Sequence, residues 1–224
     1  MPIRPLVFSD NPLLRKKSHQ VRHISPALRQ LIDDMVETMR TSNGIGLAAI
    51  QIGVPERVIV VEVPEEVPEE EDQEEDQEED QNEETPRPTI FHVVINPELA
   101  RKSRQVEEGI EGCLSVPGWI GEVSRHRTVT VKGLDPQGKE VRIKAEGLLA
   151  RVFQHEIDHC DGILFIDRIE DSEKIWPVLV PHWSIGRTCL GSQSAGGNSS
   201  VMPRPFEPTR WLPLLTESNP CASS

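Results

Sequence analysis

Two stretches of the chain carry apolar residues at the three- and four-residue spacing of an amphipathic helix. The first follows Ser25-Pro26, which is typical of a helix start because serine caps free N–H groups and proline suits the first turn. Its apolar positions are Leu28, Leu31, Ile32, Met35, Val36 and Met39, and Asn43-Gly44 marks its expected end. The second contains Leu148, Leu149, Val152, Phe153 and Ile157 and is expected to end near Gly162. We expect both helices to turn an apolar face toward a core.

Segments rich in β-branched residues lie between these helices and predict strands. Arg57–Val63 and Ile90–Asn96 each contain several valines and isoleucines. Two further segments, 128–134 and 140–144, flank Asp135-Pro136-Gln137-Gly138, which is typical of a turn. The pattern therefore predicts a β-hairpin in addition to two separate strands.

An acidic run separates the first two predicted strands. Residues 65–84 hold fourteen Asp and Glu and no Lys or Arg, which accounts for the net charge of -13, since the rest of the chain has 23 acidic and 24 basic residues. Like charges repel, and little there can offset the cost of ordering the backbone, so we expect a disordered, solvated insertion at about 64–87. A tether for a basic partner or a cation trap is the alternative interpretation.

The composition limits the remaining possibilities. A chain of 224 residues suffices for one domain with a sizeable core and is borderline for two. Beyond about Asp171 the apolar pattern fades, and residues 171–224 are rich in Pro, Gly and Ser, so we expect a largely irregular tail; its tryptophans leave open that part of it docks on the body. The sequence has no run of about 18 apolar residues and no signal-peptide layout, so we expect a cytoplasmic protein without a membrane span.

The strongest chemical signal is His155-Glu156-Ile157-Asp158-His159, a His-Glu-x-x-His pattern in the second predicted helix. Residues four apart on a helix share a face, so His155 and His159 can bind one metal ion while Glu156 reaches a water on that ion. The alternative is an exposed helix with two histidines and a carboxylate. The apolar spacing around the pair favours the metal site, because it turns the pair toward the core.

A catalytic zinc or iron site usually takes three protein ligands, so a third ligand is needed. The residues after His159 offer none before His182, in the tail, and we therefore look upstream. Cys113 stands in a glycine-rich segment, Glu111-Gly112-Cys113-Leu114-Ser115, where the backbone can approach a ligand closely. One thiolate with two imidazoles suits zinc, iron(II), nickel or cobalt. Taken without the histidines, Cys113 would be interpreted as a small buried apolar residue.

A third segment, residues 44–53, is rich in small residues and contains Gln51. It lacks the Lys-Ser/Thr ending and the preceding strand of a phosphate-binding loop. Small residues would allow a peptide backbone to lie alongside, and Gln51 offers an amide donor. By composition alone, a tightly packed connection between a helix and a loop is the simpler interpretation.

Together, GIGLAAIQ (residues 44–51), EGCLS (residues 111–115) and QHEIDH (residues 154–159) resemble the peptide deformylase family. The resemblance runs from about residue 2 to residue 170, interrupted by the acidic insertion, and places a catalytic domain at 1–170 and the tail at 171–224. It implies an α+β fold with antiparallel sheets packed around a central helix that carries the His-Glu-x-x-His pattern, plus an N-terminal amphipathic helix. The activity it implies is removal of the formyl group from N-formylmethionine on newly made polypeptides.

The resemblance also implies roles for individual residues. Cys113, His155 and His159 would hold one divalent metal ion, with Fe²⁺ expected in the cell and Zn²⁺, Ni²⁺ or Co²⁺ as alternatives. Glu156 would be the general acid and base. The remaining implied residues are Gln51 and the Leu114 backbone N–H as oxyanion donors, and Ile45, Gly46 and Gly112 along the substrate groove.

Two features depart from the family pattern, and two other functions remain open. Cys160 stands where an apolar residue such as leucine is usual, and we interpret it as a small core residue. Arg151 places a cation near the expected methionine pocket.

The partners implied are formyl-Met nascent peptides and, transiently, the ribosome near its exit tunnel, without sequence-specific nucleic-acid binding. The alternatives are a His-Glu-x-x-His metallopeptidase and a non-catalytic, metal-stabilised module associated with the ribosome.

Overall fold

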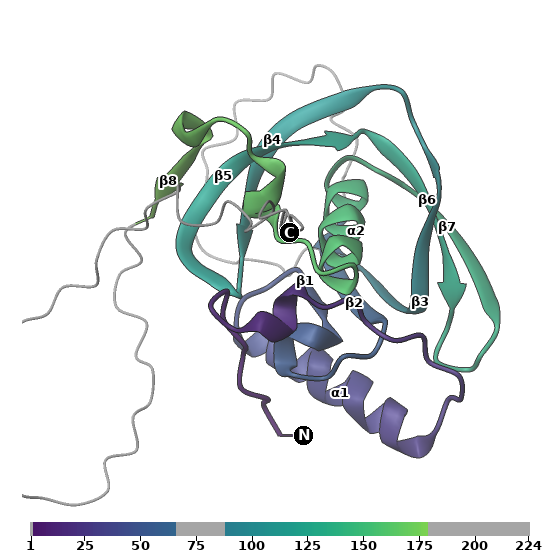
Figure 1. Cartoon of the computed structure of the whole chain (residues 1–224). Coiled ribbons are helices and arrows are strands. Elements are labelled where there is room, and N and C mark those ends of the chain that lie inside the picture. Colours follow the sequence, from purple (N-terminus) through teal and green to yellow (C-terminus); the bar gives the residue numbers. More distant parts are fainter. Residues whose placement is uncertain (1, 66–87, 179–224) are drawn as a thin grey trace, which may run out of the picture. The chain divides into compact units, whose positions relative to one another are not determined.

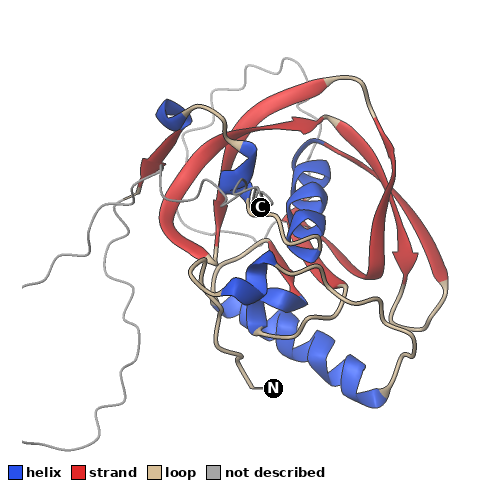
Figure 2. Ribbon diagram, viewed as in Figure 1, coloured by secondary structure: helices blue, strands red, loops and turns tan. Residues whose placement is uncertain are grey.

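The structure is a computed structural model that describes residues 2–65 and 88–178 (Figure 1). Most of the predicted acidic insertion at about 64–87, and the tail from residue 179 onward, lie outside the described residues. Two α-helices, eight strands and four short 3₁₀ turns form within these ranges (Figure 2). The helices are α1 (Pro26–Thr41) and α2 (Gly147–Cys160). The strands are β1 (Gly46–Ala48), β2 (Val58–Pro64), β3 (Thr89–Lys102), β4 (Val106–Cys113), β5 (Val116–His126), β6 (Thr128–Leu134), β7 (Glu140–Glu146) and β8 (Ile175–Pro177).

All strand pairs in the described residues are antiparallel and fall into two sheets. One sheet has the order β1-β2-β3-β6-β7 and the other has the order β4-β5-β8. Figure 1 shows α2 lying between the two sheets, with α1 on the far side of β1 and β2. The fold therefore combines antiparallel sheets with helices, which is the α+β class expected from the sequence.

Strand β2 is covered on both faces, which explains its unbroken apolar sequence. Val58 and Val60 belong to the core cluster that packs against α1. Ile59 and Val61 point the other way, into the cluster that contains the apolar residues of α2. The five-stranded sheet thus separates an α1 side from an α2 side.

Helix α1 begins where its cap predicts. The Ser25 side chain accepts a hydrogen bond from the Leu28 N–H at 3.2 Å. The buried face is not purely apolar, because Asp34 and Thr38 are buried as well and both bind Arg4. The helix ends at Thr41, slightly before the expected Asn43-Gly44, and Asn43 takes a left-handed φ of 52°.

Strand β3 continues six residues beyond the predicted Ile90–Asn96. Asn96 has a positive φ of 54°, and the pairing with β6 shifts register between Ile95 and Glu98. The Asn96 side chain bonds both the N–H and the carbonyl of Val21. This irregularity breaks the alternation of apolar residues, so the second half of the strand left no pattern in the sequence.

The predicted hairpin is confirmed. β6 pairs with β7, and the Asp135 carboxylate accepts hydrogen bonds from the Gln137 and Lys139 N–H groups, both at 2.9 Å. Gly138 supplies the positive φ of 87° that the turn requires. Residues 175–177, within the segment assigned to the tail, form β8, in which Trp176 pairs with Ile120 of β5.

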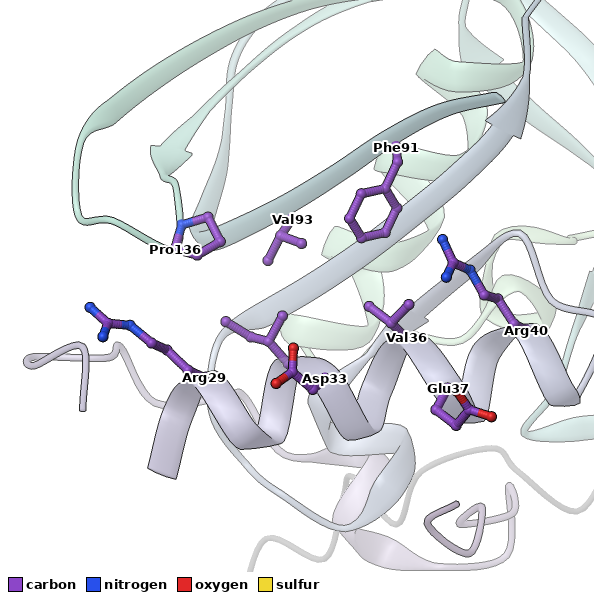
Figure 3. Close-up of a pocket in the computed structure, with 9 residues that line it drawn as sticks. Arg29, Asp33, Val36, Glu37, Arg40, Phe91, Val93 and Pro136 are labelled. Atoms are coloured by element: carbon purple, nitrogen blue, oxygen red, sulfur yellow. The ribbon is translucent and has the colours of Figure 1, made fainter. Parts of the chain in front are cut away.

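A groove of about 520 Å³ lies on the α1 side of the five-stranded sheet (Figure 3). Phe91 and Val93 of β3 form its floor, Val36 of α1 faces them, and Pro136 closes one end. At the other end the Arg40 guanidinium lies 5.6 Å from the centre of the Phe91 ring. None of the residues selected for metal chemistry lines this groove.

Neither of the two described helices is long and apolar enough to cross a membrane.

Candidate metal centre

Cys113, His155 and His159 meet at one point between β4 and α2. One ligand atom from each lies within 4.8 Å of the other two. The Cys113 sulfur is 3.2 Å from Nε2 of His159, and this nitrogen is 3.2 Å from Nε2 of His155. Among the described residues, this is the one group of three or more His, Cys, Asp or Glu side chains that could hold a metal ion.

Local structure explains how the sulfur reaches the histidines. Cys113 is the last residue of β4, and the register of the β4–β5 pair shifts between Gly112 and Cys113. Leu114 and Ser115 then form the turn into β5, and the Ser115 N–H points at the sulfur, 3.4 Å away. The histidines are four residues apart on α2 and therefore share a face. His159 is fully buried and His155 is 9 % exposed.

Glu111 orients the first histidine. Its Oε2 lies 2.9 Å from Nδ1 of His155, which leaves Nε2 of that ring to face the cluster. Arg125 binds the same carboxylate through Nε and Nη2, at 2.8 and 2.9 Å. Burial raises the Glu111 pKa, but hydrogen bonds from Arg125 and His155 outweigh it and bring the pKa down to about 2.

A second carboxylate continues this network away from the candidate metal ligands. Asp158, between the two histidines in sequence, accepts hydrogen bonds from Arg125 and from Arg168. Sequence reasoning assigned no role to Glu111, Arg125 or Asp158. Glu111 stands two residues before Cys113, so it would share a strand face with the ligand, but residues 106–113 (VEEGIEGC) did not indicate a strand.

Glu156 is a buried carboxylate beside the first histidine. It is 3 % exposed, and its Oε2 has no hydrogen-bond partner among the described residues. Burial is the main cause that raises its pKa to about 7. A carboxyl group with this pKa can both accept and donate a proton near neutral pH.

The segment of small residues at positions 44–53 lies next to Glu156 and Cys113. Gly46 begins strand β1, and a Cβ atom there would lie 2.4 Å from Oε1 of Glu156. Gln51 is 1 % exposed, and its Nε2 lies 3.5 Å from the Cys113 sulfur and 3.2 Å from Oγ of Ser115. Its Oε1 accepts a hydrogen bond from the Ala48 N–H, which fixes the direction of the amide.

The remaining residues singled out in the sequence lie around this point. Leu114 occupies the first position of the β4–β5 turn, Gly112 is the residue before Cys113 in β4, and Ile45 is 42 % exposed next to β1. Cys160 is fully buried, and burial raises its pKa to about 12, in agreement with its interpretation as a small core residue. Arg151 does not extend freely; its guanidinium is bound to β4.

The donor set fits a divalent cation. The sulfur and the two Nε2 atoms converge within 4.8 Å of one another, and one thiolate with two imidazoles is a set of ligands suited to zinc or iron(II). Glu111 accepts at Nδ1 of His155 and so leaves Nε2 as the ligand atom. Three protein ligands with a buried carboxylate beside them are typical of a catalytic site, because a structural site is closed by four. Fold and site together are therefore those expected of an α+β metal-dependent hydrolase, with Cys113, His155 and His159 as its candidate ligands.

Comparison with known proteins narrows this class to one family. The polypeptide deformylase family model matches residues 3–175. A peptide deformylase of Thermomicrobium roseum is 49% identical over 172 residues, which cover 76% of this chain and 88% of the relative. The crystal structure of peptide deformylase from Ehrlichia chaffeensis is 36% identical, with a TM-score of 0.64, over 77% of this chain and 90% of that one. A Met-Ala-Ser-bound deformylase from Acinetobacter baumannii is 36% identical, with a TM-score of 0.63, over 75% of this chain and 99% of that one. The chain belongs to the peptide deformylase family.

Proposed function

We propose that this chain hydrolyses the N-formyl group from N-formylmethionine at the start of newly synthesised polypeptides. The observation that carries the proposal is the joint placement of three ligand atoms within 4.8 Å and a buried carboxylate, Glu156, next to one of them in sequence. Membership of an enzyme family named for this reaction supports it. In this proposal α2 is the central helix of a catalytic domain that spans residues 1–170, and residues 171–224 follow it as a tail whose first part, β8, pairs with β5.

Cys113, His155 and His159 would hold the metal ion, and we propose Fe²⁺ in the cell, with Zn²⁺, Ni²⁺ or Co²⁺ able to replace it. When bound, such an ion lowers the pKa of a coordinated water to roughly 7 and polarises a carbonyl group. Glu156 accepts the proton of the attacking water, because its pKa of about 7 suits both directions of transfer. It then donates that proton to the nitrogen that leaves, so formate and a free amino terminus result.

Negative charge develops on the formyl oxygen during the attack, and two donors are placed to meet it. Gln51 directs its amide nitrogen toward the Cys113 sulfur, and Leu114 carries its N–H at the adjacent turn. A donor of this kind contributes about 3–4 kcal/mol to the transition state. Because Ala48 fixes Oε1 of Gln51, the amide nitrogen needs little reorganisation to act.

The substrate would bind as an extended strand. β1 and β4 are edge strands of their respective sheets, and edge strands accept an added peptide through backbone hydrogen bonds. Ile45 and Gly46 at β1 and Gly112 at β4 would line this groove. The Acinetobacter baumannii relative, whose structure contains Met-Ala-Ser, supports a peptide of this type as ligand. The partners are formylated nascent chains and, transiently, the ribosome, which places the protein in the cytoplasm.

The test is hydrolysis of formyl-Met-Ala-Ser by the full chain, loaded with metal under nitrogen. The proposal predicts equal amounts of formate and intact Met-Ala-Ser. Release of free amino acids would instead identify a metallopeptidase. Metal binding without any product would identify a non-catalytic, metal-stabilised module.

A further inference from the structure

Arg151 joins α2 to the strand that carries Cys113. It stands one helical turn before His155, and its side chain is 15 % exposed. Nη2 donates to the Glu107 carbonyl at 2.9 Å, and Nη1 donates to the Glu111 carboxylate at 3.0 Å. Both acceptors belong to β4, on either side of Gly109, so the guanidinium joins residues that are four positions apart in the strand.

The same guanidinium also bonds the neighbouring strand. Nη1 lies 2.8 Å from the Val123 carbonyl and 3.3 Å from the Gly109 carbonyl. Gly109 and Val123 are direct partners in the β4–β5 ladder, so Arg151 reaches both strands at one rung. A planar fork with several fixed donors can do this, whereas the single ammonium group of a lysine cannot reproduce the geometry.

Gly109 provides the space for this contact. A Cβ atom at Gly109 would lie 2.7 Å from Nη2 and 2.8 Å from Cζ of Arg151. The guanidinium cannot simply retreat, because its hydrogen bonds to β4 and β5 hold it in place. The absent side chain of Gly109 and the forked side chain of Arg151 are therefore complementary.

The contact bears on the metal ligands through Glu111. Oε1 of Glu111 accepts from both Arg125 and Arg151, while Oε2 accepts from Arg125 and faces Nδ1 of His155. Without Arg151, the carboxylate would keep one guanidinium partner, and β4 would lose its hydrogen bonds to α2 at this level. The His155 ring would then be held less firmly in the direction that a ligand needs.

We propose that Arg151, seated on Gly109, is a positioning residue that locks β4 against α2 and holds Glu111 in the orientation that directs His155 at the metal ion. The inference rests on the proposed function, because it assigns this contact to the same metal centre. It makes Arg151 part of the support of the site although the residue is not a ligand.

The test measures the Zn²⁺ dissociation constant of the full chain by competition with a chromophoric chelator. Arg151→Met keeps the aliphatic length and removes every donor, and we expect it to weaken Zn²⁺ binding about 3- to 10-fold, less than the 10- to 100-fold typical of a direct partner of a ligand. Arg151→Lys should fall between Arg151→Met and the parent. The matched control is Arg127→Met, because Arg127 is 45% exposed and its ion pairs with Glu107 and Glu146 are at the surface. Parental Zn²⁺ affinity in Arg151→Met, even with a lower melting temperature, would overturn the proposal.

A double substitution separates this contact from a general loss of packing. Gly109→Ala should weaken Zn²⁺ binding when Arg151 is present and add little in the Arg151→Met background, because the clash needs the guanidinium. Equal losses in both backgrounds would contradict the proposal. If Arg151→Met does not fold, Arg151→Lys and Gly109→Ala decide the same question. The Zn²⁺ measurement does not depend on turnover. A parent chain that releases no formate would therefore contradict the proposed function without changing what the Zn²⁺ dissociation constants say about Arg151.

Discussion

Gly46 lies against Glu156 so closely that a Cβ atom on the glycine would stand 2.4 Å from Oε1 of the carboxylate. The same Cβ atom would be 2.9 Å from Cγ1 of Val152, so it would clash with both neighbours unless Glu156 and Val152 moved. The buried carboxylate and edge strand β1 are thus fitted to each other without a side chain between them. This close approach explains why a residue without a side chain stands at position 46.

Gly46→Ala should lower kcat/KM for formyl-Met-Ala-Ser by about 10²-fold, since a displacement of roughly 1 Å at a catalytic group costs this much. Metal content should stay at the parental value, because a Cβ atom at position 46 would meet Glu156 and Val152 and none of the three proposed ligands. Steady-state kinetics together with metal analysis check the prediction. Parental kcat/KM in the alanine variant would show that Glu156 can move without consequence.

Glu156→Gln should keep the metal and lose nearly all turnover. The amide has the shape of the carboxyl group but can neither take the proton of water nor return it to the leaving amine. The turnover rate should therefore fall by about 10²- to 10⁴-fold or more. Formate release and metal content, measured on the same preparation, decide the outcome. Turnover at the parental rate would remove Glu156 from the proposed mechanism.

The raised pKa of Glu156 also predicts how the stability of the metal-free protein depends on pH. Burial moves this pKa from 4.5 to about 7, so between these values the folded protein holds a proton that the unfolded chain releases. The contribution of Glu156 to the free energy of unfolding therefore falls as the pH rises through this window. Above pH 7 the metal-free Glu156→Gln protein should be the more stable of the two, by up to about 3 kcal/mol.

Urea unfolding of both proteins at several pH values, with chelator present, measures this difference. The gap between variant and parent should widen from about pH 4.5 to pH 7 and then stay constant. A gap that is the same at every pH would mean that the folded protein does not raise the pKa of Glu156.

Cys113→Ser should weaken metal binding strongly, because a hydroxyl group is a far poorer ligand than a thiolate for zinc or iron(II). Cys160→Ala is the matched control: Cys160 is fully buried one residue after His159 but is packed in the core. Metal content after dialysis should fall in the serine variant and stay parental in the control. Equal metal content in all three proteins would assign the third ligand to another residue.

The sequence predicted the parts of this molecule that periodicity encodes. The apolar spacing of residues 28–39 coincides with α1, that of residues 148–157 with α2, and the turn residues 135–138 with the β6–β7 hairpin. Strand β4 could not be predicted in this way, because its inward face consists of Glu107, Gly109, Glu111 and Cys113, which hold polar contacts with α2. A strand that builds a site does not show the alternation of one that fills a core.

The same reason limited what could be predicted about the site. His155 and His159 follow from helix geometry, because residues four apart share a face. The approach of Cys113 to His159 joins residues more than thirty positions apart, and so do the Glu111–His155 and Arg125–Asp158 contacts. Such contacts exist only once β4 is packed against α2. The local pattern of apolar and polar residues therefore cannot predict them.

A crystal structure of the full chain loaded with Co²⁺, with the ion located by its anomalous scattering, would test whether Cys113, His155 and His159 hold one metal ion together. We expect one ion per chain, about 2.3 Å from the Cys113 sulfur and about 2.0–2.1 Å from Nε2 of both His155 and His159, distances typical of such ligands. An ion bound elsewhere, or bound by the histidines with the Cys113 sulfur turned away, would contradict this expectation.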